Sequence, residues 1–220
     1  MSQPAVKRAC MRDHIRDILV GRILDGTYPA GTQLKELYLA REFHVSQAPI
    51  REALRELEGS GLVSSERFRG TRVRGADFAE MRESYELRTM LEVRSVVLSA
   101  PYKPDLLADL AACLQKMDAA VKSDDSEAYI DNALRFHRRL VESSGNRTFL
   151  AVWDSLLWDI RGRIALRRLA EMGKSLKPFV GMHKAVLGRL REQDAAGAAE
   201  RVRAVLMRVC SAFDRDGAAR

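Results

Sequence analysis

The stretch from Leu34 to Arg74 constrains the fold of this 220-residue chain more than any other segment does. Apolar residues recur there at helical spacing, and the pattern is interrupted at residues 44–46, where Ser46 can N-cap a second helix. Pro49 falls in the first turn after that cap, where its missing N–H costs little. We therefore predict two short helices joined by a tight turn. The apolar residues that carry the pattern are Leu34, Leu37, Leu39, Ala40 and Phe43, and then Ile50, Ala53, Leu54 and Leu57.

A basic segment bounded by glycines follows the second helix. Gly59 and Gly61 end that helix, and Leu62 and Val63 begin a strand. Four arginines then surround Gly70, as expected of a hairpin whose tip approaches a phosphate backbone. Helix, turn, helix and basic hairpin are the order of parts in a winged helix-turn-helix. The arginines are Arg67, Arg69, Arg72 and Arg74.

The outward face of the second helix is polar. A helix that lies in the major groove of DNA needs an apolar back and a front that offers side chains to base edges and phosphates. Amphipathic helices alone are more often plain packing, and a basic hairpin alone is often a solvated turn. Their combination within about forty residues favours DNA binding. The polar face consists of Gln47, Ala48, Arg51, Glu52 and Arg55.

The run HVSQAPIREALRELEGSGLV resembles the signature of the GntR family of transcription regulators, and the resemblance extends from about Met11 to Arg74. It implies that Arg51 is a principal DNA contact. The family usually has Arg where this chain has Gln47. Since Arg favours guanine and Gln favours adenine, we expect an operator that differs from the commonest family half-site. The other implied contacts are Ser46, Gln47, Ala48 and Pro49 at the start of the recognition helix, and Arg69, Gly70 and Thr71 at the wing tip.

Charge and composition agree with a nucleic-acid partner in the cytoplasm. The formal net charge is +7; residues 1–76 hold 13 Lys and Arg against 9 Asp and Glu, and residues 77–220 hold 24 against 21. The excess of base is concentrated in the shorter N-terminal part, which favours a polyanion. No apolar run reaches the ~18–20 residues of a membrane span, and we recognise no secretory signal, so we expect no membrane partner. The three cysteines lie far apart, which favours reduced thiols.

From Asp77 onward the sequence has the pattern of a helical bundle. Six stretches of helical period with short links predict a compact all-α domain. The predicted fold class is thus mostly α, with a winged helix-turn-helix domain over residues 1–76 and a helical domain over residues 77–220. The short linker at Gly75-Ala76 couples the two domains, as a ligand-driven switch requires. The predicted helices are about 77–99, 104–121, 126–143, 148–168, 177–192 and 195–213.

Three stretches of the second domain resemble the FCD effector-binding bundle of the FadR-like GntR subfamily. The resemblance implies that the helices surround a cavity for a small organic acid or related metabolite, and that the chain forms a homodimer. The stretches are ELRTMLEVRSVVLSA (86–100), RFHRRLVESSGNRTFLAVWDSL (135–156) and HKAVLGRLREQDAAGAA (183–199).

Many members of this bundle class hold a divalent cation with one Asp and three His, and this chain keeps only part of that set. His137 and His183 stand at the first two histidine positions, whereas Ala133 lies where the Asp is expected and the third histidine position falls near Val205. Two imidazoles and water form a poor site compared with four protein ligands. We therefore expect no certain cofactor, and keep a weakly bound zinc, manganese or nickel ion as the alternative.

His137 and His183 also fit an effector-binding role. Our hypothesis is that both line the cavity as neutral hydrogen-bond donors, and that Arg88 supplies a positive charge for a carboxylate. Two satisfied core histidines, and an internal ion pair between Arg88 and Glu92, are the competing interpretations.

These features together predict a ligand-responsive transcription regulator. It would bind a short pseudo-palindromic operator in double-stranded DNA as a homodimer, and repression is the usual direction in the family. An architectural DNA-binding protein without an effector is the alternative. We do not expect an enzyme, because the sequence has no nucleophile-elbow pattern, no glycine-rich phosphate loop and no convergent carboxylates and histidines.

Overall fold

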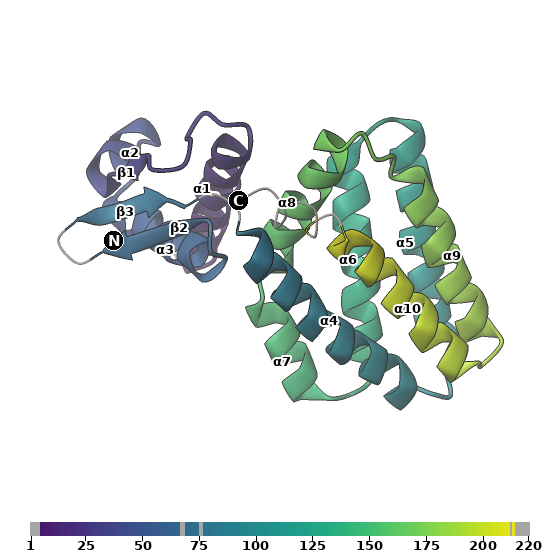
Figure 1. Ribbon diagram of the computed structural model, residues 1–220. Helices are drawn as coiled ribbons and strands as arrows, with labels where there is room; N and C mark the ends of the chain where they lie inside the picture. Colours follow the sequence, from purple (N-terminus) through teal and green to yellow (C-terminus); the bar gives the residue numbers. More distant parts are fainter. Residues whose placement is uncertain (1–4, 67–68, 75–76, 212, 214–220) are drawn as a thin grey trace. The chain divides into compact units, whose positions relative to one another are not determined.

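The computed structural model describes residues 5–66, 69–74, 77–211 and 213. It divides into two compact units, residues 1–77 and 78–220. The first unit combines three helices with a small sheet, and the second is entirely helical among the described residues (Figure 1). The predicted fold class, mostly α with a winged helix-turn-helix before a helical bundle, is confirmed.

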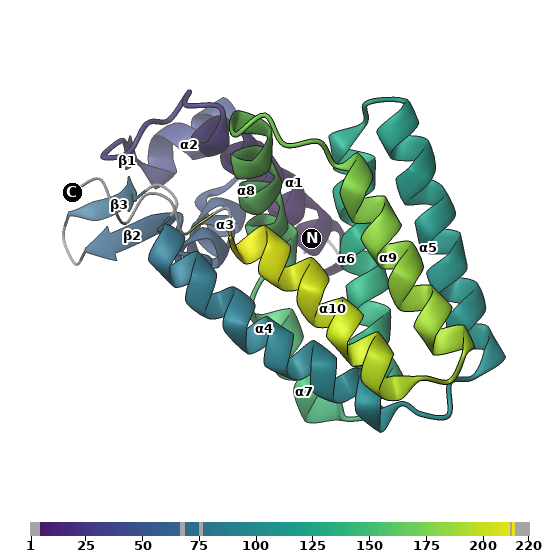
Figure 2. The same cartoon turned by 45° about the vertical axis from the view of Figure 1, so that its right-hand side comes forward.

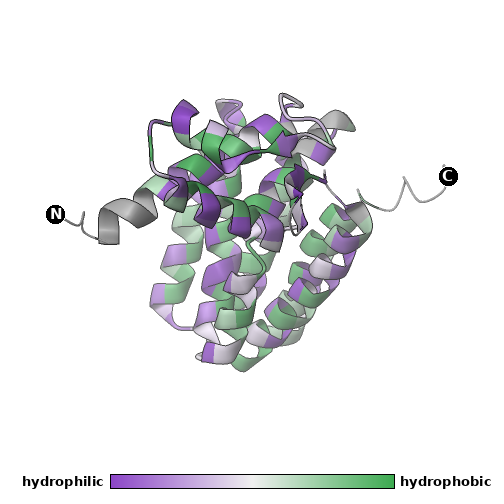
Figure 3. Cartoon of the chain, turned by 90° about the vertical axis from the view of Figure 1, so that its left-hand side faces the viewer, coloured by the Kyte–Doolittle hydropathy of each residue, from purple (hydrophilic) through white to green (hydrophobic). Residues whose placement is uncertain are grey.

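Three amphipathic helices form the core of the first unit. They are α1 (Ala5–Leu24), α2 (Glu36–Glu42) and α3 (Gln47–Gly59), and α3 packs against both of the others. Helices α1 and α3 pack together, and Ile15 and Leu19 of α1 are fully buried, as are Ile50 and Leu57 of α3. Hydrophilic and hydrophobic residues alternate along these helices, as amphipathic packing requires (Figure 3).

A three-stranded antiparallel sheet completes the first unit. Its strands are β1 (Gln33–Leu34), β2 (Val63–Glu66) and β3 (Gly70–Val73), in the order β1-β3-β2. Strands β2 and β3 form the predicted hairpin, in which Glu66 pairs with Gly70. Gly70 has a φ of 76°, a conformation that L side chains rarely adopt. Arg67, predicted beside this tip, lies outside the described residues.

The sequence-based boundaries of the first motif helix were wrong. Leu34, which we assigned to that helix, is a buried residue of β1, where it pairs with Thr71. Leu37 lies on α2 but is 48% exposed. Only two of the predicted apolar residues, Leu39 and Ala40, are buried on α2. A two-residue strand is too short to have a period-2 pattern of its own, so it merged with the helical pattern that follows.

The turn between α2 and α3 is a Schellman motif. His44 has a φ of 53°, the amide of His44 donates to the carbonyl of Arg41, and the amide of Val45 donates to the carbonyl of Ala40. Ser46 then occupies the N-cap position of α3, although its side chain makes no capping hydrogen bond. The turn thus directs α3 through backbone geometry more than through side-chain capping.

The described part of the second unit contains seven helices, and α6 packs against four of the others. Helix α6 contacts α4, α5, α7 and α8, while α9 and α10 close the bundle between α5 and α4 (Figure 2). The helices are α4 (Phe78–Leu98), α5 (Pro104–Lys122), α6 (Ser126–Ser143), α7 (Arg147–Ser155), α8 (Trp158–Glu171), α9 (Lys177–Arg191) and α10 (Ala195–Cys210).

One predicted helix, at about 148–168, is in fact two. Helix α7 begins after Asn146, whose side chain accepts hydrogen bonds from the amides of Thr148 and Phe149. It ends at Ser155, and Leu157 has a φ of 51°, which interrupts the helical path before α8 begins. The apolar period continues across the break because Trp153 and Trp158 are both buried. The hydrophobic pattern therefore could not indicate the change of direction.

Replacement of His44 tests the role of the turn in the stability of the first unit. We expect His44→Gly to raise the free energy of unfolding by about 0.5–1 kcal/mol, because glycine accepts a positive φ without strain. His44→Val should lower it by at least about 1 kcal/mol, because a β-branched residue is the least suited to this conformation. Urea denaturation of the full chain measures both changes. Equal stability of the Gly and Val variants would contradict this role.

Candidate DNA-binding surface and effector cavity

The outer face of α3 carries the predicted DNA-binding side chains. Gln47, Ala48, Arg51 and Arg55 are all exposed, whereas Pro49 is half-buried. The opposite face is buried against the rest of the unit through Ile50, Ala53, Leu54 and Leu57. This division into an apolar back and a polar front is what a helix in a major groove needs.

Arg51 is held by a carboxylate of the neighbouring helix. Its Nε donates to Glu36 of α2 at 3.1 Å, and its Nη2 donates to the same carboxylate at 2.8 Å. This side-on pairing leaves the N–H groups of Nη1 and one N–H of Nη2 directed away from Glu36. Because a guanine base is bound by two N–H groups of one guanidinium, Glu36 can orient Arg51 without blocking such a contact.

The wing is fixed to β1 through backbone and side-chain contacts. Nε2 of Gln33 donates to the carbonyl of Arg69 at 2.9 Å, and the Arg69 side chain is 77% exposed beside Glu66. Thr71 is buried, and its Oγ1 lies 3.1 Å from Oγ of Ser65. Arg69 and Gly70 are therefore accessible at the wing, while the Thr71 side chain is used within the sheet.

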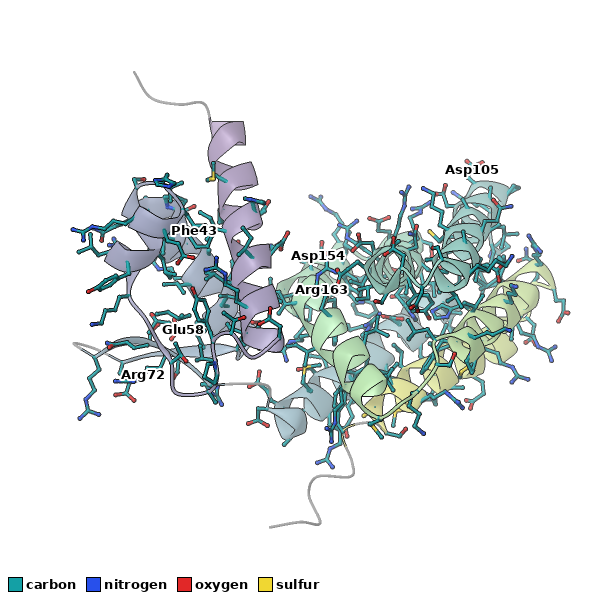
Figure 4. All side chains as sticks on the ribbon, turned by 90° about the horizontal axis from the view of Figure 1, so that it is seen from above. Phe43, Glu58, Arg72, Asp105, Asp154 and Arg163 are labelled. Atoms are coloured by element: carbon teal, nitrogen blue, oxygen red, sulfur yellow. The ribbon has the colours of Figure 1, made fainter. Side chains whose placement is uncertain are left out.

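Arg72 lies on the exposed side of β3 (Figure 4). Its Nη1 donates to the carbonyl of Gly31 at 3.1 Å, which connects the wing to the segment before β1. Two arginines of the predicted basic hairpin thus have distinct surroundings. Arg69 extends from the tip, and Arg72 is hydrogen-bonded to the segment before β1.

The helical unit contains a cavity of about 60 Å³ between α4, α6, α8, α9 and α10. One water molecule needs about 10–15 Å³ by the same measure, so the space suits a small ligand or a few waters. The three predicted effector-binding residues, Arg88, His137 and His183, all line it. Tyr85 and Tyr129 add polar groups to a wall that is otherwise mostly apolar.

A buried carboxylate organises the polar wall of this cavity. Glu92 is fully buried; its Oε1 accepts hydrogen bonds from Nε of Arg88 at 2.6 Å and from Nε1 of Trp153 at 3.0 Å. Its Oε2 lies 2.5 Å from Nδ1 of His137. Burial, the largest single effect, would raise the pKa of Glu92, but the charges and hydrogen bonds of Arg88 and His137 together outweigh it and the pKa falls to about 2. Glu92 is therefore an anion at neutral pH.

The two histidines meet through their Nε2 atoms, which lie 3.1 Å apart. Nδ1 of His183 is 2.7 Å from the carbonyl of Phe179, and Nδ1 of His137 faces the ionised Glu92. Because a carbonyl and a carboxylate only accept hydrogen bonds, each neutral ring uses its single N–H at Nδ1. Burial lowers the pKa of both histidines, for His183 to about 3, so both rings are neutral at pH 7.

The two Nε2 atoms consequently present lone pairs to each other and to the cavity. In these tautomers each Nε2 can accept but not donate a hydrogen bond, whereas a donor role was expected from the sequence. Two converging lone pairs at 3.1 Å repel each other, so a hydrogen-bond donor placed against both of them is favoured.

Comparison with protein families covers both units. The family model described as "Bacterial regulatory proteins, gntR family" matches residues 11–73, and the model of the FCD domain matches residues 83–208. The chain belongs to the GntR family. As predicted, the members of this family are DNA-binding transcriptional regulators and not enzymes.

Characterised GntR-family relatives are similar over most of the chain. A protein of Paenarthrobacter nicotinovorans, described as a probable D-xylose utilization operon transcriptional repressor, is 27% identical over 79% of this chain and 78% of its own length. The gluconate operon transcriptional repressor of Bacillus licheniformis is 29% identical over 79% of this chain and 72% of its own. The E. coli McbR/YncC structure has the same fold, with a TM-score of 0.72 at 21% identity over 92% of this chain and 96% of that one.

Two apolar residues of this GntR-family protein occupy the cavity wall beside the histidines. Ala133 and Val205, which stand where the family resemblance implies further metal ligands, both line the cavity. Their side chains have no donor atom, so they do not fit a four-ligand cation site. No group of three or more His, Cys, Asp or Glu in the described part of the chain is arranged to hold a metal ion.

The competing interpretation of Arg88 is also present in the structure. Arg88 pairs with Glu92 one helical turn away, and its guanidinium lies 4.5 Å from the ring centroid of Trp158. It nevertheless lines the cavity. Glu92 also binds His137 of α6 and Trp153 of α7, contacts that were not expected from the sequence. A glutamate on the buried face of α4 was the available signal.

Within the described ranges, no helix is long and apolar enough to cross a bilayer.

The lowered pKa of His183 predicts that the free energy of unfolding falls in mild acid. In the folded protein the ring stays neutral down to about pH 3, whereas its ordinary pKa is 6.5. The unfolded chain thus binds more protons between these values, and stability is lost as the pH falls through that window. We expect a loss of about 2 kcal/mol from His183 between pH 7 and pH 5, measured by urea denaturation.

The control is His183→Asn, which removes the titrating group and keeps an amide donor for the carbonyl of Phe179. The variant should lose about 2 kcal/mol less than the original chain over the same pH range. Glu92 does not interfere with the comparison. Its pKa is lowered from 4.5, so its effect on the free energy of unfolding appears mainly below that pH. Equal losses in both proteins would show that His183 is not held neutral by burial.

Proposed function

We propose that this GntR-family protein is a ligand-responsive transcriptional repressor that binds a short pseudo-palindromic operator as a homodimer. Residues 1–76 would bind DNA, and residues 77–220 would bind the effector and the second subunit. The observation that carries the proposal is the polar wall of the cavity, where Arg88, His137 and His183 converge in an otherwise apolar bundle. A regulator without an effector has no need for such a wall.

The DNA contacts in this proposal come from α3 and the wing. Arg51 would bind a base in the major groove, with Gln47, Ala48 and Arg55 on the same exposed face. Ser46 and Pro49 would place the N-terminal turn of α3 against the phosphate backbone, to which helix N-termini are suited. At the wing, Arg69 would bind phosphates, and the backbone at Gly70 and Thr71 would allow a close approach.

The effector in this proposal is a small hydroxylated organic acid. Arg88 is hydrogen-bonded to Glu92 through Nε, and its Nη groups would bind a carboxylate of the ligand. A hydroxyl group would donate to Nε2 of His137 or His183, which satisfies the lone pairs there. The operons named in two relatives concern D-xylose and gluconate, which are hydroxylated compounds.

A resident metal is not required by this proposal. A divalent cation at the histidines would have two imidazole ligands and otherwise water, since Ala133 and Val205 cannot bind it. Such an ion would be held weakly and would be removed by a mild chelator. Effector binding should therefore persist in the presence of the chelator.

Substitution of Arg51 tests the DNA-binding surface. We expect Arg51→Ala to weaken binding to the selected operator by about 10–100-fold, because a two-N–H base contact is lost. Arg69→Ala should weaken binding to all sequences and reduce the slope of log affinity against log salt by about 1, because a phosphate contact is lost. Fluorescence anisotropy with operator and scrambled DNA at several salt concentrations measures both effects.

Arg201→Ala is the matched control, since Arg201 is exposed on α10 of the other unit. It should leave operator affinity unchanged. Operator affinity of Arg51→Ala equal to that of the original chain, at moderate salt, would refute the assignment of α3.

A thermal-shift comparison tests the effector class. A ligand at about 100 times its dissociation constant should stabilise the protein by about 2.7 kcal/mol, or roughly 5–10 °C. We expect gluconate and related hydroxy acids to include ligands that shift the melting temperature, in the presence and absence of a chelator. Hexanoate, which has a carboxylate but no hydroxyl group, should not.

The outcomes separate the alternatives. If no acid in the panel stabilises a protein that binds its operator, the architectural role is supported and the effector proposal fails. If hexanoate stabilises the protein as well as the hydroxy acids do, the assigned role of the histidine lone pairs is wrong.

A further inference from the structure

One buried hydroxyl group of the helical unit has no hydrogen-bond partner. Tyr129 of α6 is 3% exposed, and within the described part of the chain its hydroxyl makes no hydrogen bond. The other two tyrosines of this unit are also buried, but their hydroxyls are engaged. That of Tyr102 donates to the carbonyl of Val96 at 3.0 Å, and that of Tyr85 is hydrogen-bonded to Arg88. Because a buried hydroxyl without a partner is costly, the position of Tyr129 needs a physical reason.

The Tyr129 side chain lines the effector cavity. Since the residue is buried and no described group accepts its O–H, the cavity is where a partner can reach it. Burial raises the pKa of Tyr129, so the hydroxyl keeps its proton at neutral pH and remains a donor. A donor without a partner at a cavity wall indicates a ligand atom that accepts a hydrogen bond.

The described part of the cavity wall offers few other donors. Both histidines present acceptor nitrogens there, and Tyr85 is engaged with Arg88. Arg88 in turn donates from Nε to Glu92 at 2.6 Å, so its positive charge is already compensated. A ligand carboxylate at Arg88 is therefore held by N–H donors more than by net charge, and a second donor would strengthen its binding. The hydroxyl of Tyr129 is such a donor.

Two contacts between α4 and α6 define levels along the cavity. Glu92 faces His137, and Oγ of Ser99 lies 2.7 Å from Oγ of Ser143. These pairs are seven residues apart on α4 and six residues apart on α6. The two helices consequently run in the same direction and advance together, since each residue of a helix advances by about 1.5 Å.

The same register brings Tyr129 close to the level of Arg88. Arg88 comes four residues before Glu92, so it is level with about residue 133, four residues before His137. Tyr129 is one further turn, or roughly 6 Å, along α6 in the same direction. Arg88 thus lies between the level of the histidines and the level of Tyr129, and a carboxylate bound at Arg88 has Tyr129 on its other side.

We propose that the hydroxyl of Tyr129 donates a hydrogen bond to the carboxylate of the effector, opposite Arg88. The proposal rests on the effector of the proposed function and assigns the second group that holds its acid end. One carboxylate oxygen accepts from the Nη groups of Arg88, and the other accepts from Tyr129. The hydroxyl groups of the ligand are then directed to the Nε2 atoms of the histidines. Tyr129 favours a carboxylate over a neutral group, since a hydrogen bond to a charged acceptor is stronger.

Tyr129→Phe removes the hydroxyl and keeps the ring. In the ligand-free chain we expect the melting temperature to stay the same or rise, because an unpartnered buried hydroxyl is lost. Tyr102→Phe is the matched control and should lower the melting temperature by about 2–5 °C, because its hydroxyl donates to the carbonyl of Val96. If Tyr129→Phe lowers the melting temperature as much as Tyr102→Phe does, the hydroxyl has a structural partner and the proposal is overturned.

Isothermal titration calorimetry with glycerate and gluconate, hydroxy acids of different length, measures the contact with the ligand. We expect Tyr129→Phe to raise the dissociation constant of each acid that binds by about 10–100-fold, since a hydrogen bond to a charged group is lost. The factor should be the same for both acids, because both carry the carboxylate. Tyr102→Phe should leave the constants within about twofold of those of the original chain.

The results distinguish this proposal from the proposed function. If no hydroxy acid of the thermal-shift panel binds the original chain, the effector class of the proposed function fails and the role of Tyr129 fails with it. If hydroxy acids bind and Tyr129→Phe leaves their dissociation constants unchanged, the role of Tyr129 alone is overturned. Factors that differ by more than about threefold between the acids would indicate contact with a ligand hydroxyl and would overturn the carboxylate contact.

Discussion

The buried carboxylate of Glu92 joins the helices that surround the cavity. It accepts hydrogen bonds from Arg88 on its own helix, α4, and from Trp153 on α7, and it faces His137 on α6. His137 in turn meets His183 of α9. A charge in a protein interior is tolerated when it is paired and fully hydrogen-bonded, and removing one partner of a buried pair typically costs about 3–5 kcal/mol. Four helices therefore depend on one ionised group for their positions around the ligand space.

This arrangement explains why the cavity differs from a metal centre. The two Nε2 atoms converge, as they would on a cation, but Ala133 and Val205 add only alkyl groups to the wall. The protein fixes the tautomer of each ring through its Nδ1 contact, which is the usual task of the residues behind a metal-bound histidine. Here that same support leaves two acceptor nitrogens at the wall of the cavity.

Local patterns in the sequence were sufficient to predict most of the fold. The amphipathic period of α3 and α6 and the order of helix, turn, helix and hairpin depend on neighbouring residues only, so they are visible without a structure. The predictions failed where local signals compete. Leu34 has the spacing of a helix, but the pairing of β1 with β3 decides its conformation. Leu157 interrupts a continuous apolar pattern through a backbone angle that the pattern does not encode.

The sequence predicted which residues belong to the candidate site, but not the hydrogen bonds among them. Family resemblance directed attention to His137, His183 and Arg88, and the structure brings all three to one cavity. The sequence could not assign hydrogen-bond roles, because these depend on contacts such as that between His183 and the carbonyl of Phe179. The role of Glu92 was missed for the same reason: its partners lie 45 and 61 residues away along the chain.

Helix α4 has a buried side that contributes to the cavity wall and an exposed side. Its inner side supplies Arg88 to the cavity wall and Glu92 behind it, and its outer side exposes Met90. It also begins at Phe78, directly after the unit that contains α3. A ligand carboxylate would compete with Glu92 for Arg88, so ligand binding would change a contact that holds α4 in the bundle. The ligand can change DNA affinity only by as much as its own affinity differs between the two positions of α4.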